Sequence, residues 1–97
     1  MYNKSVKIEF DPAKNAYNIK ERGLPFDDVA HLDWASAVFN VDNRKDYGER
    51  RIRAIVNDLK GVAHHVTFTL RDNGNTMRVI SFRLAREKER KRYEKET

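Results

Sequence analysis

Apolar and polar residues alternate along five short stretches of the chain, which predicts five β-strands. In each stretch the apolar residues recur at every second position, so one face suits burial and the other suits solvent. The expected strands span residues 6–10, 35–41, 50–58, 62–70 and 77–84. The sequence Asp72-Asn73-Gly74-Asn75 is typical of a hairpin turn, because Asn and Gly tolerate positive φ. The last three strands are therefore expected to form an antiparallel meander.

The segment after the first strand carries the signals of a helix over residues 12–22. Asp11 can accept hydrogen bonds from a first helical turn, and Pro12 has no N–H to leave unpaired. Gly23 suits the left-handed residue that ends many helices. The stripe expected to pack on the sheet comprises Ala13, Ala16, Tyr17 and Lys20.

Two further helices are expected. The first covers residues 25–32, where Asp27 and Asp28 favour a first turn and the apolar residues share one face. The second covers residues 85–95, within a segment (86–97) that holds six Lys or Arg and four Glu. Such a helix is either a solvated tail or a docking element for a partner. Runs of charged residues most often form a solvent-exposed surface. Residues 42–48 form a polar loop between the second and third strands.

Strand parity assigns one face of the sheet to the core and the other to solvent. In the last strand the expected inward residues are Ile80, Phe82 and Leu84. The opposite side should carry Val79, Ser81 and Arg83. Arg78 shares the inward parity, but at the strand entrance its long side chain can reach water. Over the whole sheet, the outward set is Glu9, Arg51, Arg53, His65, Thr67, Ser81 and Arg83.

These elements predict an α+β fold in a single domain, residues 1–97. Two N-terminal helices pack on the apolar face of an antiparallel sheet, because only that face is apolar enough to be covered. The other face is basic and exposed, and a charged helix ends the chain. A chain of 97 residues has room for one modest core.

Composition narrows the functional classes. The 20 Lys and Arg outnumber the 15 Asp and Glu, giving a net charge of +5, which favours polyanionic partners. Without cysteine there is no disulfide, thiolate nucleophile or Cys zinc site, and three scattered His do not suggest a metal. We expect no metal or other cofactor. No apolar run approaches the ~20 residues of a membrane span and no signal peptide is evident, so a cytoplasmic protein is expected.

The basic face suits phosphodiester chemistry on RNA. Cleavage needs activation of a 2′-hydroxyl, charge stabilisation at phosphorus and protonation of the leaving oxygen, and arginines supply the charge without a metal. The candidate catalytic residues are Glu9, Lys20, Arg22, Arg51, His65, Ser81 and Arg83. The candidate RNA-binding residues are Arg53, Arg71 and Arg78. The alternative is an ordinary solvated strand face, with a surface histidine and a strand hydroxyl. No G-x-S-x-G, Walker or H-E-x-x-H motif is present.

Three segments resemble the BrnT toxins of bacterial type II toxin-antitoxin systems. They are F-D-P-A-K-N-A-Y-N-I-K-E-R-G at 10–23, F-D-D-V-A at 26–30 and R-V-I-S-F-R-L-A-R-E-K-E-R-K-R-Y at 78–93. The resemblance implies a RelE-like fold and metal-independent RNA cleavage that arrests translation. It also implies neutralisation by a BrnA-like ribbon-helix-helix antitoxin, and contact with operator DNA through the toxin-antitoxin complex.

Lys20 matches the lysine of the family's K-H-G, whereas Arg22 stands where the family usually has histidine. The later matching positions are Arg51, Arg78, Ser81, Arg83, Glu89, Arg90 and Tyr93. Other departures are Phe10 for tryptophan and Phe82 for a small residue. Arginine cannot act as a base near neutral pH, since its pKa lies above ~12. If the histidine is catalytic in the family, another group such as Glu9 or His65 must move protons in this chain, or its activity is weak. We expect antitoxin contact through Arg86, Glu89, Arg90 and Tyr93.

Two hypotheses from different classes remain open. The first is a ribonuclease toxin that uses arginines for phosphate charge. The second is a weakly active or inactive module that serves mainly as an antitoxin partner and transcriptional co-repressor. A role in DNA binding alone is less favoured, because no recognition helix with base-reading residues stands out.

Overall fold

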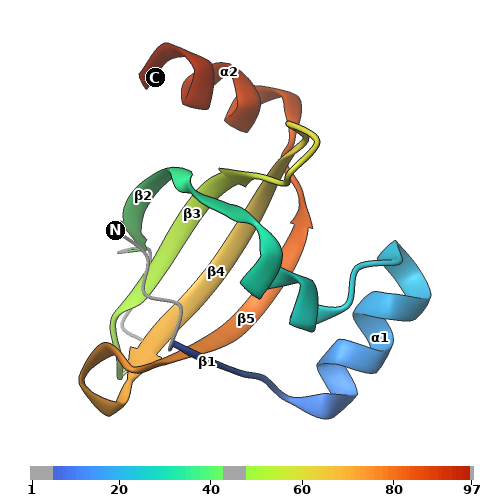
Figure 1. Ribbon diagram of the computed structural model, residues 1–97, viewed down its shortest axis with the longest axis vertical. Helices are drawn as coiled ribbons and strands as arrows, with labels where there is room; N and C mark the ends of the chain where they lie inside the picture. Colours follow the sequence, from blue (N-terminus) through green and yellow to red (C-terminus); the bar gives the residue numbers. More distant parts are fainter. Residues whose placement is uncertain (1–5, 43–47, 97) are drawn as a thin grey trace.

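The computed structural model describes residues 6–42 and 48–96 (Figure 1). Most of the predicted 42–48 loop lies outside these residues. The elements in chain order are β1 (Lys7–Glu9), α1 (Pro12–Arg22), the 3-10 helix η1 (Phe26–His31), β2 (Asp33–Asp42), β3 (Arg51–Asn57), β4 (Ala63–Arg71), the 3-10 turn η2 (Asp72–Gly74), β5 (Thr76–Leu84) and α2 (Glu87–Glu96).

The five strands form one mixed sheet with the order β1-β5-β4-β3-β2. The meander of β2 to β5 is antiparallel, as expected, but β1 pairs with β5 in parallel. The prediction of an antiparallel sheet is therefore wrong at this edge. A parallel pair needs a long connection, and α1, η1 and the strands β2 to β4 lie between β1 and β5 in the chain. On the opposite edge, the pairing of β2 with β3 shifts register between Asp33 and Val38.

The core lies on one face of the sheet, beneath η1. Residues Phe26 and Val29 of η1 are buried against the strands. Trp34 packs edge-on against Phe68 with ring centroids 5.8 Å apart, and its indole N–H donates to the Val29 carbonyl at 2.8 Å. The expected α-helix over 25–32 is thus a six-residue 3-10 helix. The core consists of Phe26, Val29, Leu32, Trp34, Ala54, Val56, Val66, Phe68, Met77, Val79 and Phe82.

Helix α1 lies beside the edge of β5 and does not cover the apolar face (Figure 1). Its predicted apolar stripe is wrong, since Tyr17 is 64% exposed and the buried residue is Asn18. The Asn18 amide donates to the Phe82 carbonyl at 2.9 Å, beyond the last β5 residue paired with β1. Two alanines offer little area to bury, so hydrogen bonds to an unpaired edge dock the helix. Asp11 caps its start and Gly23 ends it at φ 68°, as predicted.

A β-bulge in β5 reverses the predicted parity of that strand before Ser81, whereas Ser81, Phe82 and Arg83 lie on the predicted sides. Phe68 pairs with Val79 and Thr67 with Ser81, so Ile80 has no partner across β4. One extra residue shifts the alternation. Val79, expected outward, is therefore buried, and Ile80 is only partly buried. Arg78 lies beside Glu9 on the polar face, which is the side of the sheet opposite the core.

Helix α2 folds back across one end of the polar face. The sequence had left open a solvated tail or a docking element for a partner, and the structure shows the helix docked on the sheet of its own chain. Its residue Glu89 bonds to Arg83 on β5, and the Tyr93 hydroxyl donates to the Ser36 carbonyl on β2 at 2.8 Å. The helix therefore spans the sheet from β5 to β2 on this one face. The polar face is only partly exposed, because His65, Thr67 and Thr69 are buried.

Candidate functional site

The polar face presents its side chains in three rows that cross the strands. We call polar face the side of the sheet opposite the core. The first row contains Glu9, Arg78 and Thr69, together with the pair Arg51 and Asp42. The second row runs Ser81, Thr67, Arg53 and Asn40. The third row runs Arg83, His65, Ile55 and Val38. Helix α2 lies over the third row, so the first two contain the more open part of the face.

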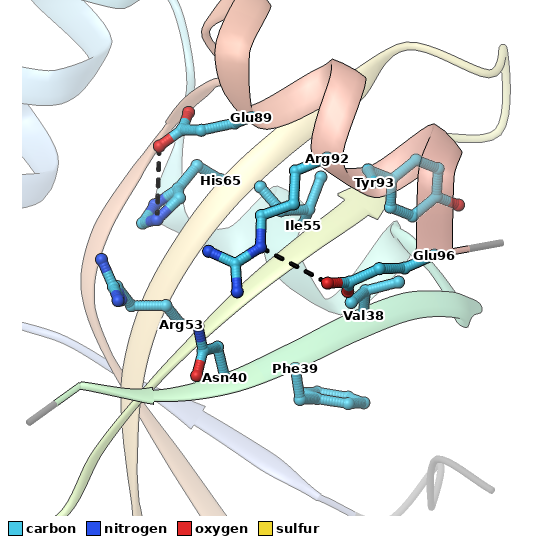
Figure 2. Close-up of a pocket in the computed structure, with 10 residues that line it drawn as sticks. All are labelled: Val38, Phe39, Asn40, Arg53, Ile55, His65, Glu89, Arg92, Tyr93 and Glu96. Carbon is cyan, nitrogen blue, oxygen red and sulfur yellow. Dashed lines mark hydrogen bonds and ion pairs between the residues drawn. The ribbon is translucent and has the colours of Figure 1, made fainter.

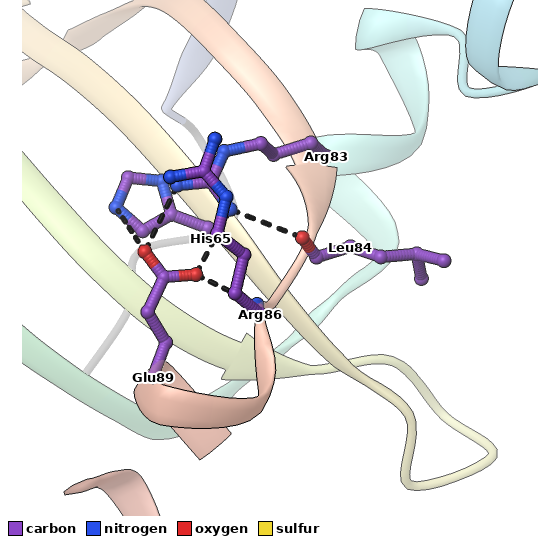
Figure 3. A network of polar contacts seen from close by, with 5 residues as sticks. All are labelled: His65, Arg83, Leu84, Arg86 and Glu89. Atoms are coloured by element: carbon purple, nitrogen blue, oxygen red, sulfur yellow. Dashed lines mark hydrogen bonds and ion pairs between the residues drawn. The ribbon is translucent and has the colours of Figure 1, made fainter.

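Glu89 joins the third row to α2 (Figure 3). Its carboxylate accepts two hydrogen bonds from the Arg83 guanidinium, both at 2.9 Å, and one from the Arg86 backbone N–H at 2.8 Å. The His65 Nε2 atom lies 3.8 Å from the same carboxylate. We name His65, Arg83 and Glu89 the Glu89 cluster. Two parallel N–H bonds to one carboxylate fix both partners in orientation.

The Glu89 cluster sets the charge of its members. The hydrogen bonds from Arg83 are the main cause that lowers the pKa of Glu89 to about 2, with a further contribution from the Arg86 backbone. Burial, and then the positive charge of Arg83, lowers the pKa of His65 to about 4. At neutral pH Glu89 is therefore ionised and His65 is neutral. A neutral imidazole can accept a proton.

A hollow of about 180 Å³ lies between α2 and the sheet (Figure 2). Arg53 and His65 line it from the strands, and Glu89, Arg92 and Tyr93 line it from α2. The volume is below the range of about 300 Å³ and more that is usual for small-molecule sites, so it admits a phosphate group but not a nucleotide. We name this space the α2 hollow.

Two polar atoms at this site are buried without a hydrogen-bond partner among the described residues. They are the Nε atom of Arg53 and the Nδ1 atom of His65. Buried polar atoms are normally paired, and an exception marks a place where a ligand or water can bind. Arg92, by comparison, contacts Glu96 at 3.4 Å.

The other candidate residues occupy different places. Glu9 and Arg78 form an ion pair in the first row. Arg71 pairs with Glu49 at 3.2 Å at the far end of β4. Lys20 is exposed on α1. The structure thus brings Arg53, Ser81, Arg83 and His65 together on neighbouring strands, and it leaves Lys20 and Arg71 outside the α2 hollow.

Arg22 belongs to a separate part of the surface. Its guanidinium donates to the Asn18 side chain at 2.8 Å, and it lines a second hollow with Ser81, between α1 and β5. Among the expected antitoxin contacts, Glu89 and Tyr93 are bound within the chain. Arg86, just before α2, and Arg90, on α2, are exposed.

Sequence reasoning missed Arg92 as a residue of the site. Glu89, Arg92, Tyr93 and Glu96 are spaced three or four residues apart, which places them on one face of a helix. That spacing was visible in the sequence. The docking of this helix face on the strands was not, because an almost wholly charged helix gives no apolar signal for packing.

The sequence profile described as "Ribonuclease toxin, BrnT, of type II toxin-antitoxin system" matches residues 10–89 of the chain. The chain belongs to the BrnT family. This confirms the resemblance found in its motifs. The family is one of ribonuclease toxins of type II toxin-antitoxin systems, so an antitoxin partner is implied.

The fold is also similar to a solved member of the BrnT family. The crystal structure of the Brucella abortus ribonuclease toxin, BrnT, matches with a TM-score of 0.62 at 28% identity, over 84% of this chain and 99% of that one. No curated protein sequence gives a match.

The segment 78–93, in which the chain resembles the BrnT toxins, holds α2 in place. Its members Arg83, Glu89 and Tyr93 are the side chains that fasten α2 across the sheet. Within residues 6–42 and 48–96, no three His, Cys, Asp or Glu side chains are grouped to hold a metal ion. The helices in those ranges are too short or too polar to cross a membrane.

Proposed function

We propose that the chain is a metal-independent endoribonuclease whose active centre is the α2 hollow. The observation that carries this proposal is a neutral, buried His65 beside an arginine, Arg53, whose Nε atom has no partner in the described residues. Guanidinium groups supply the positive charge that a metal supplies in other nucleases.

In the proposed reaction, His65 acts as the general base. Glu89 beside Nε2 favours a proton on that nitrogen, which leaves Nδ1 as the acceptor. Nδ1 takes the proton of a 2′-hydroxyl, the 2′ oxygen bonds to phosphorus and the bond to the 5′ oxygen breaks. The products are a 2′,3′-cyclic phosphate and a 5′-hydroxyl, whose proton comes from solvent.

The arginines divide between binding and positioning. Arg53 and Arg92 flank the α2 hollow and hold the charge that develops on the phosphate. Arg83 acts through Glu89 and His65, so it is a positioning residue. The space admits only a phosphate, so the part of α2 beyond Glu89 must move outward before the 2′-hydroxyl reaches Nδ1, while the Glu89 cluster stays in place. The open rows of the polar face, with Arg51, Arg78 and the hydroxyl of Ser81, would guide the strand.

The test is cleavage of a defined RNA by the purified protein with EDTA present, read by the ends of the products. We expect cleavage that persists in EDTA, yields cyclic phosphate ends and is abolished by His65→Gln. His31→Ala is the matched control, because His31 is exposed on η1. Cleavage that needs a divalent ion, or that survives His65→Gln, would refute this centre.

We further propose that a BrnA-like ribbon-helix-helix antitoxin neutralises the toxin, and that RNA cleavage in the cytoplasm arrests translation. The exposed basic residues Arg86 and Arg90 suit contact with an acidic partner. Operator DNA would be bound through the antitoxin, and the fold would be related to RelE. Intact RNA together with tight antitoxin binding would instead support the partner-module hypothesis, with Arg22 the first residue to change to histidine.

A further inference from the structure

A second hollow, of about 330 Å³, lies between α1 and β5. On the α1 side it is lined by Ala13, Lys14, Tyr17 and Arg22, and on the β5 side by Ile80 and Ser81. Its volume is at the lower end of the range of about 300–1,000 Å³ for ligand sites, which fits one flat ring rather than a whole nucleotide. We name it the α1 hollow. Ile80, the extra residue of the β5 bulge, and its neighbour Ser81 both line it.

Tyr17 and Phe39 are the aromatic side chains that are more than half exposed among the described residues, and Tyr17 is the more exposed of the two. It is 64% exposed, although an aromatic ring normally buries most of its surface. No other aromatic ring contacts it in the described part of the chain. A tyrosine that borders an apolar hollow and keeps one ring face in solvent is able to stack on a planar ligand.

The charge around the α1 hollow favours an anionic ligand. Lys14 and Arg22 line it, and no carboxylate does so among the described residues. The first turn of α1 contains no acidic residue, and its last turn carries Lys20 and Arg22. A ring site flanked only by cations suits a base whose own phosphates lie beside it.

The α1 hollow and the α2 hollow share no lining residue, but one row of the polar face joins them. Ser81 lines the α1 hollow and also begins the second row of the polar face, which leads through Thr67 to Arg53. Ser81 and Arg53 are two strands apart, about 10 Å. A nucleotide near the scissile phosphate can therefore place its base in the α1 hollow.

We propose that the α1 hollow binds one base of a single-stranded RNA substrate by stacking on Tyr17, with Lys14 and Arg22 contacting the adjoining phosphates. This inference rests on the proposed ribonuclease function and adds a base-binding subsite to it. Proteins commonly recognise single-stranded RNA by splaying out a base and stacking it on an aromatic side chain. A protein partner on this surface is the alternative that the experiment must separate.

The experiment uses a single-stranded 2′-O-methyl RNA oligonucleotide with one 2-aminopurine base, which lacks the attacking hydroxyl and cannot be cleaved. Stacking on Tyr17 should quench the fluorescence of the base. Tyr17→Phe should retain the quenching, and Tyr17→Ala should lose it and bind about 5- to 150-fold more weakly. Ile19→Ala is the control, because Ile19 is exposed on the same helix but does not line the hollow.

The outcomes separate this inference from the proposed function. If Tyr17→Ala binds and quenches as the unchanged protein does, the inference is wrong, whether or not RNA is cleaved. If quenching depends on Tyr17 but neither the unchanged protein nor any variant cleaves RNA, the base-binding site is supported and the proposed active centre is wrong. If Tyr17→Ala loses antitoxin binding and keeps RNA binding, the surface is a protein interface and the inference is wrong.

Discussion

Changing Glu89 to glutamine tests whether this residue fastens α2 to the sheet. The substitution keeps the size of the side chain and removes the charge that accepts two hydrogen bonds from Arg83. Arg83 and His65 then remain largely buried without their carboxylate. A charge left buried without its partner destabilises the folded state.

The magnitude follows from the titration of Glu89. Its pKa falls from 4.5 to about 2 in the folded protein, which corresponds to about 3 kcal/mol of stability at neutral pH. Its side chain is 23% exposed, so solvent screens the interaction only in part. Glu87 offers a control on the same helix, because its pair with Lys91 is 72% exposed and worth less than about 0.5 kcal/mol.

The lowered pKa of Glu89 determines how its contribution to the free energy of unfolding changes with pH. A carboxylate whose folded pKa lies below its unfolded pKa stabilises the fold above pH 4.5, and that stabilisation is lost as the pH falls to about 2. Urea unfolding, followed by the fluorescence of Trp34, the single tryptophan, measures the free energy of unfolding. We expect Glu89→Gln to lose about 3 kcal/mol at pH 7 and to approach the unchanged protein near pH 2. Equal losses for Glu89→Gln and Glu87→Gln at pH 7 would refute the reasoning.

Three further predictions concern other parts of the molecule. Because the pKa of His65 is lowered to about 4, RNA cleavage should keep its rate as the pH falls through 6.5 and decline only near 4; a decline centred at 6.5 would contradict this. Asn18→Ala should lower the free energy of unfolding by about 2–3 kcal/mol, because it leaves buried carbonyls unpaired, whereas Glu21→Gln on the same helix should have little effect in the same urea titration. Arg53→Gln should reduce the rate of RNA cleavage about 100-fold without changing stability, and Lys60→Gln, in the β3–β4 turn, should leave the rate unchanged.

The strands and the ends of α1 could be predicted because their signals are local. Alternation defined the five strands to within one or two residues, and Asp11, Pro12 and Gly23 marked the helix that is observed at Pro12–Arg22. Such signals depend only on neighbours in the chain. The identity of the α+β fold follows from them.

The features that escaped prediction depend on contacts between distant residues. The bulge at Ile80 arises from the pairing of β5 with β4, which no local pattern records. The place of α1 was missed because an asparagine, not an apolar stripe, docks it. The alternation placed His65 and Arg83 on one face of the sheet, as the structure does. The docking of α2 over them could not be predicted, because a helix made almost wholly of charged residues gives no apolar signal for packing.

The docking of α1 has a consequence for self-association. Unpaired strand edges invite added strands from other molecules and so promote aggregation. On β5, beyond its pairing with β1, the Asn18 amide donates a hydrogen bond to the Phe82 carbonyl. That carbonyl is then not available as an acceptor to an incoming strand. At the other edge the irregular register of β2 confines regular pairing with β3 mainly to Val38–Asp42. Strand addition to β5 is therefore disfavoured at Phe82, and on the other edge the regular strand that a second copy or a partner peptide meets is the short part of β2 at Val38–Asp42.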